Sequence, residues 1–335
     1  TISFVQDILM NYFLPNVGEL NFQQKAYCLG NIVYNLLLVF TNLEPPTDRD
    51  SFLYKRVESP GRLLYDLFKE YYKLQQDHIK LKLDSEYNYK KSKTTYQGES
   101  FKDLLTKNYE KIFSERITEV GFKKAFKGNW GASEHTKKVG VVQDLNRLSY
   151  NSFISHLRKI NLPMDSSAKV VKPRLLHGSQ WGIIDPVDTP DGGNVGFHKH
   201  MAISTHITSG CSSYPMMKFF RSMLNMKLLE ECTPSSLFSA SKIMINGVWV
   251  GVLNNPQETM RLVKKYKRNG LIPIYNSISW NIHKNEILVY TDSGRLCRPL
   301  FYIENNKASF NKKELLEKIT KNDFYWNDLL TGFAK

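Results

Sequence analysis

Residues 172–194, KPRLLHGSQWGIIDPVDTPDGGN, decide how this sequence is interpreted. A basic segment is followed by an acidic turn in which Pro186 and Pro190 fix the backbone angle φ. Gly192 and Gly193 allow positive φ or close approach of another group. A backbone constrained in this way suits a site that holds groups against a ligand. The alternative is a tight surface turn without a ligand, and composition alone slightly favours that alternative.

The basic charge of the chain is concentrated around this stretch. The formal net charge is +14, which implies an acidic partner such as nucleic acid, an anionic membrane or acidic proteins. Residues 121–175 hold eleven Lys or Arg and three Asp or Glu, a net +8. A patch of this density favours phosphate binding over a merely solubilising surface.

Length and composition restrict the class of protein. With 335 residues and 41% hydrophobic side chains, the chain has room for two or more domains with real cores. The longest apolar run, residues 32–40, is interrupted by Asn35 and is too short to cross a bilayer. The chain starts at Thr1 without a signal sequence, which we interpret as an internal piece of a longer chain.

The cysteines predict neither a zinc site nor a disulfide framework. No C-x-x-C pair occurs, and the four are far apart in sequence. Reduced, buried or half-buried thiols of an intracellular protein are expected. They are Cys28, Cys211, Cys232 and Cys297.

Hydrophobic spacing predicts helices in the first half of the chain and strands in the last third. Helices are expected over 1–40 with a break at 15–18, and over 61–83, 100–127, 145–160 and 256–269. Loops are expected over 44–50, 84–99 and 161–200. Strands are expected over 243–245 and 248–252, and over 286–290 and 298–303. Asn246-Gly247 between the first two strands is a strong hairpin signal, whereas 291–294 forms a turn between the others.

Seven short motifs stand in one order between residues 129 and 192. They are Asn129-Trp130-Gly131, Leu145-Asn146-Arg147, Ser155-His156-Leu157-Arg158-Lys159, Lys172-Pro173-Arg174, His177, Trp181-Gly182 and Asp188-Thr189-Pro190-Asp191-Gly192. This ordered set closely resembles the fork region of the second-largest subunit of multisubunit DNA-directed RNA polymerase, called beta in bacteria. In detail it is more similar to the eukaryotic and large-DNA-virus enzymes than to the bacterial one.

The resemblance extends over nearly the whole chain. Further motifs are Asp48-Arg49-Asp50, Pro60-Gly61, Asn246-Gly247-Val248-Trp249, Asp292-Ser293-Gly294-Arg295-Leu296-Cys297-Arg298-Pro299 and Tyr325-Trp326-Asn327-Asp328-Leu329-Leu330. The implied fold class is α+β and multidomain, with a helical N-terminal part, a fork of helices and loops, and mixed β-rich external domains. The implied parts are the C-terminal part of the lobe (1–55), the return into the protrusion (56–120), the fork (121–205), external domain 1 (206–297) and the start of external domain 2 (298–335).

The function implied by the resemblance is a share in template-directed nucleotidyl transfer with two Mg²⁺ ions. In this family the largest subunit holds the main Mg²⁺, so no catalytic residue and no metal ligand is expected here, and the fragment alone should be inactive. The implied partners are the largest subunit, other polymerase subunits, template DNA, nascent RNA and the incoming NTP, and no membrane. The implied location is intracellular: the nucleus, or a cytoplasmic factory or virion if the chain is viral.

The resemblance also implies which residues lie near nucleic acid or NTP. Residues 128–139 would be the first fork loop, near the upstream edge of the RNA–DNA hybrid, and 162–171 the second, near downstream strand separation. The candidates are Trp130, Lys137, Lys138, Arg158, Lys159, Lys169, Lys172, Arg174, Asp188 and Asp191. The two aspartates stand where the family usually has Glu and would orient basic groups. The tip Met164-Asp165-Ser166-Ser167 lacks the usual glycines.

Several single residues allow both a functional and a structural interpretation. His198, His200 and His206 could suggest a metal site, but no Cys or carboxylate completes a ligand set, and structural or exposed histidines are favoured. His156 and His177 are expected to hold local structure. Trp130 could stack on a base or pack at the root of its loop. The cations at 264–268 and the segment 86–97 are expected on solvated surfaces.

Two other functions remain open at the level of sequence. One is a stand-alone nucleic-acid-binding module, and the other is a scaffold whose basic patch meets acidic proteins. Steep salt dependence of DNA binding separates these two. Continuation of the gene into further polymerase motifs favours the polymerase subunit.

Overall fold

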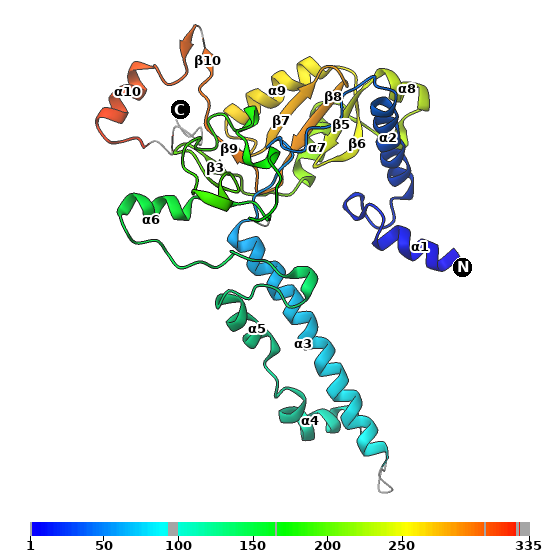
Figure 1. The fold of residues 1–335 in the computed structure, drawn as a ribbon. Coiled ribbons are helices and arrows are strands. Elements are labelled where there is room, and N and C mark those ends of the chain that lie inside the picture. Colours follow the sequence, from blue (N-terminus) through cyan, green and yellow to red (C-terminus); the bar gives the residue numbers. More distant parts are fainter. Residues whose placement is uncertain (1, 93–99, 165, 305, 326–327, 329–335) are drawn as a thin grey trace. The chain divides into compact units, whose positions relative to one another are not determined.

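The structure is a computed structural model that describes residues 2–92, 100–164, 166–304, 306–325 and 328. It confirms the α+β class with several separate sheets. The chain divides into two compact units, which are described separately (Figure 1). Unit 1 comprises Thr1–Arg56 and Ser204–Lys335, and unit 2 comprises Val57–Ile203.

Unit 2 is built on the long helix α3, Pro60–Lys91 (Figure 1). The helices α4, Phe101–Ile112, and α5, Ile117–Phe126, both pack against it. The loop expected from residue 84 is therefore wrong as far as Lys91, while 93–99 lie outside the described residues. Lys90 and Lys91 in the last turn favour the helix because they complement the negative end of its dipole.

The helix expected over 100–127 is two helices in the structure. Ser100 caps α4, and its hydroxyl accepts a hydrogen bond from the N–H of Asp103. Residues 113–116 break the helical run before α5 begins. The buried core that joins α5 to α3 contains Leu67, Tyr71, Ala125 and Trp130.

The rest of unit 2 is short elements joined by loops. Helix α6, Tyr150–Leu157, is shorter than the predicted 145–160 because Ser149 and Ser152 form a capping box at its start. Strand β1, Lys159–Asn161, pairs antiparallel with β2, His198–His200. The 3₁₀ turns are η2, Glu134–Thr136; η3, Lys172–Arg174; η4, Gly178–Gln180; and η5, Gly192–Asn194.

Unit 1 contains a five-stranded sheet in the order β4-β6-β5-β8-β7. The strands are β4, Lys227–Leu228; β5, Ser241–Ile245; β6, Val248–Leu253; β7, Ser277–Asn281; and β8, Glu286–Tyr290. Only the β5–β8 pair among them is parallel. The predicted hairpin is confirmed, since Asn246 and Gly247 both have positive φ between β5 and β6.

Two hydrophobic clusters use different side chains of β6. Val250 belongs to a cluster with Phe220 of α7, Tyr214–Met223, and Val263 of α9, Pro256–Arg268. Trp249 belongs to a second cluster with Cys28 of α2, Phe22–Phe40. Strand β6 therefore contributes buried side chains to both clusters, and its pairing with β5 shifts register between Ile243 and Met244.

The strand expected over 298–303 is wrong for residues 298–302. Instead β9, Leu296–Cys297, pairs with β3, His206–Ile207. Pro299 lacks the N–H that a continuing ladder needs. The remaining elements are α1, Ile2–Asn11; η1, Pro15–Val17; η6, Leu229–Glu231; α8, Pro234–Ser239; β10, Ile303–Glu304; β11, Lys307–Ala308; and α10, Lys313–Thr320.

Candidate nucleic-acid interface

Arg174 directs its guanidinium group at the chain's own backbone. Five hydrogen bonds leave its three nitrogens, which matches the number of N–H groups on the side chain. Nε donates to Val170 O at 3.2 Å, Nη1 to Gly193 O at 2.6 Å and Val195 O at 2.8 Å, and Nη2 to Ser166 O and Ala168 O, both at 3.2 Å. Arg174 thus joins the segment 166–170 to the segment 193–195.

The surroundings of Arg174 are closely packed. Its guanidinium carbon lies 3.7 Å from the ring centroid of Phe197, a side chain that is only 1% exposed. Gly196 has φ of +74°, and a Cβ there would lie 2.3 Å from the carbonyl oxygen of Arg174. Only glycine combines this backbone angle with this close approach.

Arg158 ends α6 and fastens it to the segment after β2. Its Nη2 donates to Ala202 O at 2.6 Å, and its backbone carbonyl accepts from Met201 N at 3.0 Å. Lys159 is the first residue of β1 and is half-buried, paired in register with His200. These two candidates therefore lie at the start of the small β1–β2 sheet.

Asp188 bridges α6 and β2. The Ser155 hydroxyl donates to Asp188 Oδ2 at 2.6 Å, and His200 Nδ1 lies 3.3 Å from Oδ1 and 2.9 Å from the Asp188 carbonyl oxygen. Asp185 shapes the turn before it by accepting the N–H groups of residues 187 and 188. Asp191 is exposed and precedes η5 without capping it through its side chain.

Several cations of unit 2 are exposed to solvent. Within the described part of the chain, an ion pair holds none of Lys124, Lys127, Lys137, Arg147, Lys169 and Lys172. Lys138 differs, since its ammonium group pairs with the Glu58 carboxylate. Lys123 also differs, because it pairs with Glu119 at 2.7 Å. The unpaired group supplies positive charge that is available to a phosphate backbone.

Trp130 packs at the root of its loop. The side chain is 6% exposed and lies in one cluster with Leu67, Tyr71 and Ala125. The Tyr71 hydroxyl also donates to Gly131 O at 3.3 Å, which fixes the next residue. Of the two interpretations of Trp130, packing is the one that this burial supports.

Two of the histidines hold local structure, as the sequence predicts. His156 Nδ1 accepts from Asn146 N at 3.0 Å, and the other ring nitrogen lies 2.9 Å from Gln143 Oε1. His177 precedes η4, and its Nδ1 accepts from Ser179 N at 3.1 Å. Both rings therefore fix the path of loops beside the motifs in which they occur.

His198 has a pKa below its ordinary value of 6.5. Burial is the main cause, followed by the charge of Lys159 and then by His200. His198 Nδ1 lies 2.7 Å from Asn161 Oδ1, an acceptor for the N–H of the neutral ring. The ring is therefore favoured in its neutral form.

A metal site does not fit the residues described. Among them, no three His, Cys, Asp or Glu side chains converge in a way that could hold an ion.

The cysteines are free, as predicted. Cys28 is buried, Cys232 and Cys297 are partly buried, and Cys211 is exposed, which the sequence did not predict. Burial raises the pKa of Cys297, although Arg295 and Lys267 nearby oppose this effect.

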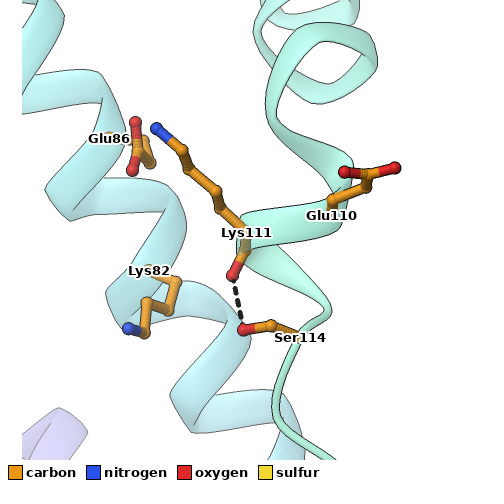
Figure 2. A pocket seen from close by; sticks show the side chains of 5 residues that line it. All are labelled: Lys82, Glu86, Glu110, Lys111 and Ser114. Atoms are coloured by element: carbon orange, nitrogen blue, oxygen red, sulfur yellow. Dashed lines mark hydrogen bonds between the residues drawn. The ribbon is translucent and has the colours of Figure 1, made fainter.

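A pocket in unit 2 lies between α3 and α4, outside the fork motifs. It is lined by Lys82, Glu86, Glu110, Lys111 and Ser114, so both signs of charge occur together. Figure 2 shows Lys111 extended toward Glu86, while the Ser114 hydroxyl donates to Lys111 O at 3.0 Å. This mixture does not suit a phosphate chain.

Sequence reasoning missed Ser155, Gly196 and Phe197 as parts of this site. Gly196 follows Gly192 and Gly193 within one short turn, which is a signal for close backbone approach. A buried aromatic beside an arginine carries no comparable signal, because the two are 23 positions apart. Likewise, nothing local links Ser155 to Asp188.

Comparison with known proteins gives two family matches and a set of longer relatives that align with most or all of this chain. Residues 143–207 match RNA polymerase Rpb2, domain 3, and residues 243–304 match RNA polymerase Rpb2, domain 4. RNA polymerase II subunit RPB2 of Encephalitozoon cuniculi is 34% identical over 100% of this chain and 28% of its own length. RNA polymerase II subunit 2 of Arabidopsis thaliana is 34% identical over 94% of the chain and 26% of its own length.

A more distant relative is RNA polymerase III subunit RPC2 of Schizosaccharomyces pombe. It is 28% identical over 90% of the chain and 25% of its own length. The chain thus spans roughly a quarter of the curated relatives it matches. Within the described residues, no helix is both long and apolar enough to cross a membrane.

Proposed function

We propose that this chain, a member of the family of second-largest DNA-directed RNA polymerase subunits, forms part of the wall of the cleft in which transcription takes place. The relatives that match 94% to 100% of the chain are polymerase subunits about four times its length. The chain therefore acts within a nucleotidyltransferase complex, and it does not polymerise nucleotides alone.

The observation that carries this proposal is the set of exposed cations in unit 2 that no ion pair holds among the residues that the structure describes. Lys137 lies in the segment 128–139, Lys169 lies in 162–171, and Lys172 directly follows. Lysine ammonium groups satisfy phosphate oxygens as point charges, and each contact releases counterions from the nucleic acid. We assign these lysines to the phosphates of the template strand, the RNA–DNA hybrid or the incoming NTP.

Other candidate residues stabilise the structure of the cleft wall. Arg158 and Asp188 fasten α6 to its neighbours, and Trp130 and Lys138 fix the segment 128–139. Lys159 and Asp191 remain candidates near the nucleotide, on the evidence of their motifs. Arg174 is likewise a candidate residue of this wall.

The proposed division of the chain into parts follows from the family resemblance. We assign 1–55 to the lobe, 56–120 to the return into the protrusion, 121–205 to the fork, 206–297 to external domain 1 and 298–335 to the start of external domain 2. The limits of unit 2, Val57–Ile203, lie close to the limits of the second and third parts together, which supports this division. Asp165 and four residues of the motif at 325–330 lie outside the described residues.

The proposed partners are the largest subunit, which would hold the Mg²⁺ ions, other polymerase subunits, template DNA, nascent RNA and NTP. The RNA polymerase II relatives favour the nucleus as the place of action. A viral factory or virion has no support from these relatives.

The test is made in the assembled polymerase that contains the full-length subunit. Affinity for nucleic acid falls as the salt concentration rises, and Lys169→Ala and Lys172→Ala, singly and together, should make this dependence shallower. The slope of log affinity against log salt should decrease in magnitude by about 0.9 for each lost phosphate contact. Elongation should slow in parallel. The matched control is Lys264→Ala with Lys265→Ala on α9, two exposed lysines of unit 1, which should change neither value.

Three outcomes separate the alternatives. A shallower salt dependence of binding together with slower elongation supports a cleft wall. A shallower salt dependence of binding in a chain that never assembles with other polymerase subunits indicates a stand-alone nucleic-acid-binding module. An unchanged slope in the double variant contradicts the phosphate contacts and favours a scaffold for acidic proteins.

A further inference from the structure

We propose that Arg174 is a positioning residue, which holds the segment 166–170 against the segment 193–197 and thereby presents Lys169 to the nucleic acid. This inference rests on the proposed function, because it assigns a task within the same cleft wall. It differs from a direct phosphate contact, which the basic character of Arg174 alone would suggest.

The hydrogen-bond partners of Arg174 favour positioning over phosphate binding. All five are neutral backbone carbonyls, three on one segment and two on the other. A phosphate could take one of these N–H groups only by leaving a carbonyl without its partner.

The two segments are also in direct contact. A Cβ on Gly193 would lie 3.5 Å from both Ser166 Cβ and Ser166 O, which is van der Waals distance. Phe197 supports the guanidinium plane from one side, and Gly196 contacts the backbone of Arg174 itself. Arg174 is therefore half-buried and held between the two segments, with its guanidinium group against Phe197.

The consequence for Lys169 follows from its place in the chain. Arg174 holds the carbonyl groups of Ala168 and Val170, the residues immediately before and after Lys169. Lys169 itself is exposed, and within the described part of the chain no ion pair holds it. The geometry thus fixes the backbone on both sides of an exposed cation while its ammonium group stays available.

Arginine is required for this task and lysine cannot replace it. A lysine has three donors on one nitrogen and no plane that could stack on Phe197. It would keep the charge at position 174 but could not reach five carbonyls in two segments. Arg174→Lys therefore separates the two roles, because it keeps a positive charge for a phosphate but cannot form the five hydrogen bonds of the clamp.

The first experiment measures elongation by the assembled polymerase with Arg174→Lys, Arg174→Ala or Lys169→Ala in the full-length subunit. Arg174→Lys and Arg174→Ala should slow elongation equally, by about tenfold, since small displacements of positioning groups have effects of this order or larger. Arg261→Lys, at an exposed arginine of α9, is the matched control and should match the parent. Near-parental elongation by Arg174→Lys overturns the proposal.

The second experiment asks whether Arg174 acts through Lys169. In a double-mutant cycle, Lys169→Ala should slow the parent enzyme but have little further effect in the Arg174→Lys background. A merely structural role of Arg174 gives effects that multiply, and that result overturns the proposal. If the Arg174 variants do not assemble, Phe197→Leu replaces them, and its coupling to Lys169→Ala is read in the same way.

The third experiment does not depend on transcription. Amide hydrogen exchange of the full-length subunit should become faster in 166–170 and 193–197 with Arg174→Lys, and not with Lys169→Ala. Unchanged exchange in both segments overturns the clamp even where the parent enzyme transcribes. Faster exchange in an assembly without polymerase activity retains the clamp and overturns the proposed function.

Discussion

Gly121 lies against the ring of Tyr71 so closely that a Cβ at position 121 would be 2.4 Å from Cδ1 and Cε1 of that ring. This contact allows α5 to pack tightly on α3. The hydroxyl of the same tyrosine donates to Gly131 O, beyond the end of α5. One buried ring therefore fixes both the helix pair and the start of the segment 128–139.

Gly121→Ala is expected to lower the free energy of unfolding of unit 2 by about 1–3 kcal/mol, since the added methyl overpacks a buried contact. Urea denaturation followed by circular dichroism measures the change. Gly30→Ala in α2 is the control, because a Cβ there meets nothing within 4 Å. Alanine should stabilise that helix by about 0.5–1 kcal/mol. Equal effects of the two changes would contradict the packing argument.

The pKa of His198 predicts a pH dependence of stability. Burial, Lys159 and His200 lower this pKa in the folded state, so below about pH 6.5 the unfolded chain binds a proton that the folded chain does not. Stability should therefore fall as the pH drops from 6.5 toward the folded pKa. His198→Asn should remove this part of the slope. Urea midpoints of both proteins at pH 7.5 and 5.5 provide the measurement, and identical differences would sink the idea.

The cysteines should react with a thiol reagent in the order of their exposure. Cys211 is expected to react first and Cys28 last. Cys297 should be slow in spite of its basic neighbours, because burial raises its pKa and lowers the thiolate fraction. Timed alkylation of the native protein followed by peptide mass spectrometry tests this order. Rapid labelling of Cys297 would contradict it.

Lys25 is expected to fasten α1. Its side chain is 2% exposed, and its ammonium group donates to Leu9 O at 2.5 Å and Met10 O at 3.3 Å. Lys25→Met keeps a similar length but removes both charged hydrogen bonds, with an expected loss of about 1.5–3 kcal/mol. Amide exchange in α1 should increase. Lys264→Met, at an exposed position of α9, is the control, and equal exchange in the two variants would rule out the fastening role.

Local signals predicted the elements that depend on neighbouring residues. The Asn246-Gly247 hairpin and the helix from Pro256 follow from turn chemistry and helical spacing, and both are present. The long helix was predicted to stop near residue 83, although Tyr87 and Tyr89 continue it to Lys91. The polar composition of residues 84–91 favours a loop, whereas an exposed helix can be equally polar.

Long-range relationships could not be predicted from the sequence. Strand β8 was expected, but its parallel pairing with β5 was not, because pairing across about 40 residues leaves no local signal. Strand β7, which pairs with β8 across the four residues 282–285, was also not expected. The basic patch was predicted from charge alone. Charge does not distinguish Lys169, which is exposed, from Arg174, whose five donors point at backbone carbonyls. That difference is set by tertiary packing.

The parallel pairing of β5 with β8 has a consequence for biosynthesis. Strand β8 begins at Glu286, 41 residues after β5 ends at Ile245, so the hairpin with β6 leaves the ribosome first. At about 5–20 residues per second, the open edge of β5 waits for seconds before its neighbour exists. An expression fragment that stops between 254 and 285 would retain this unpaired edge permanently. Copies of such a fragment would aggregate, because their unpaired β5 edges would associate with one another.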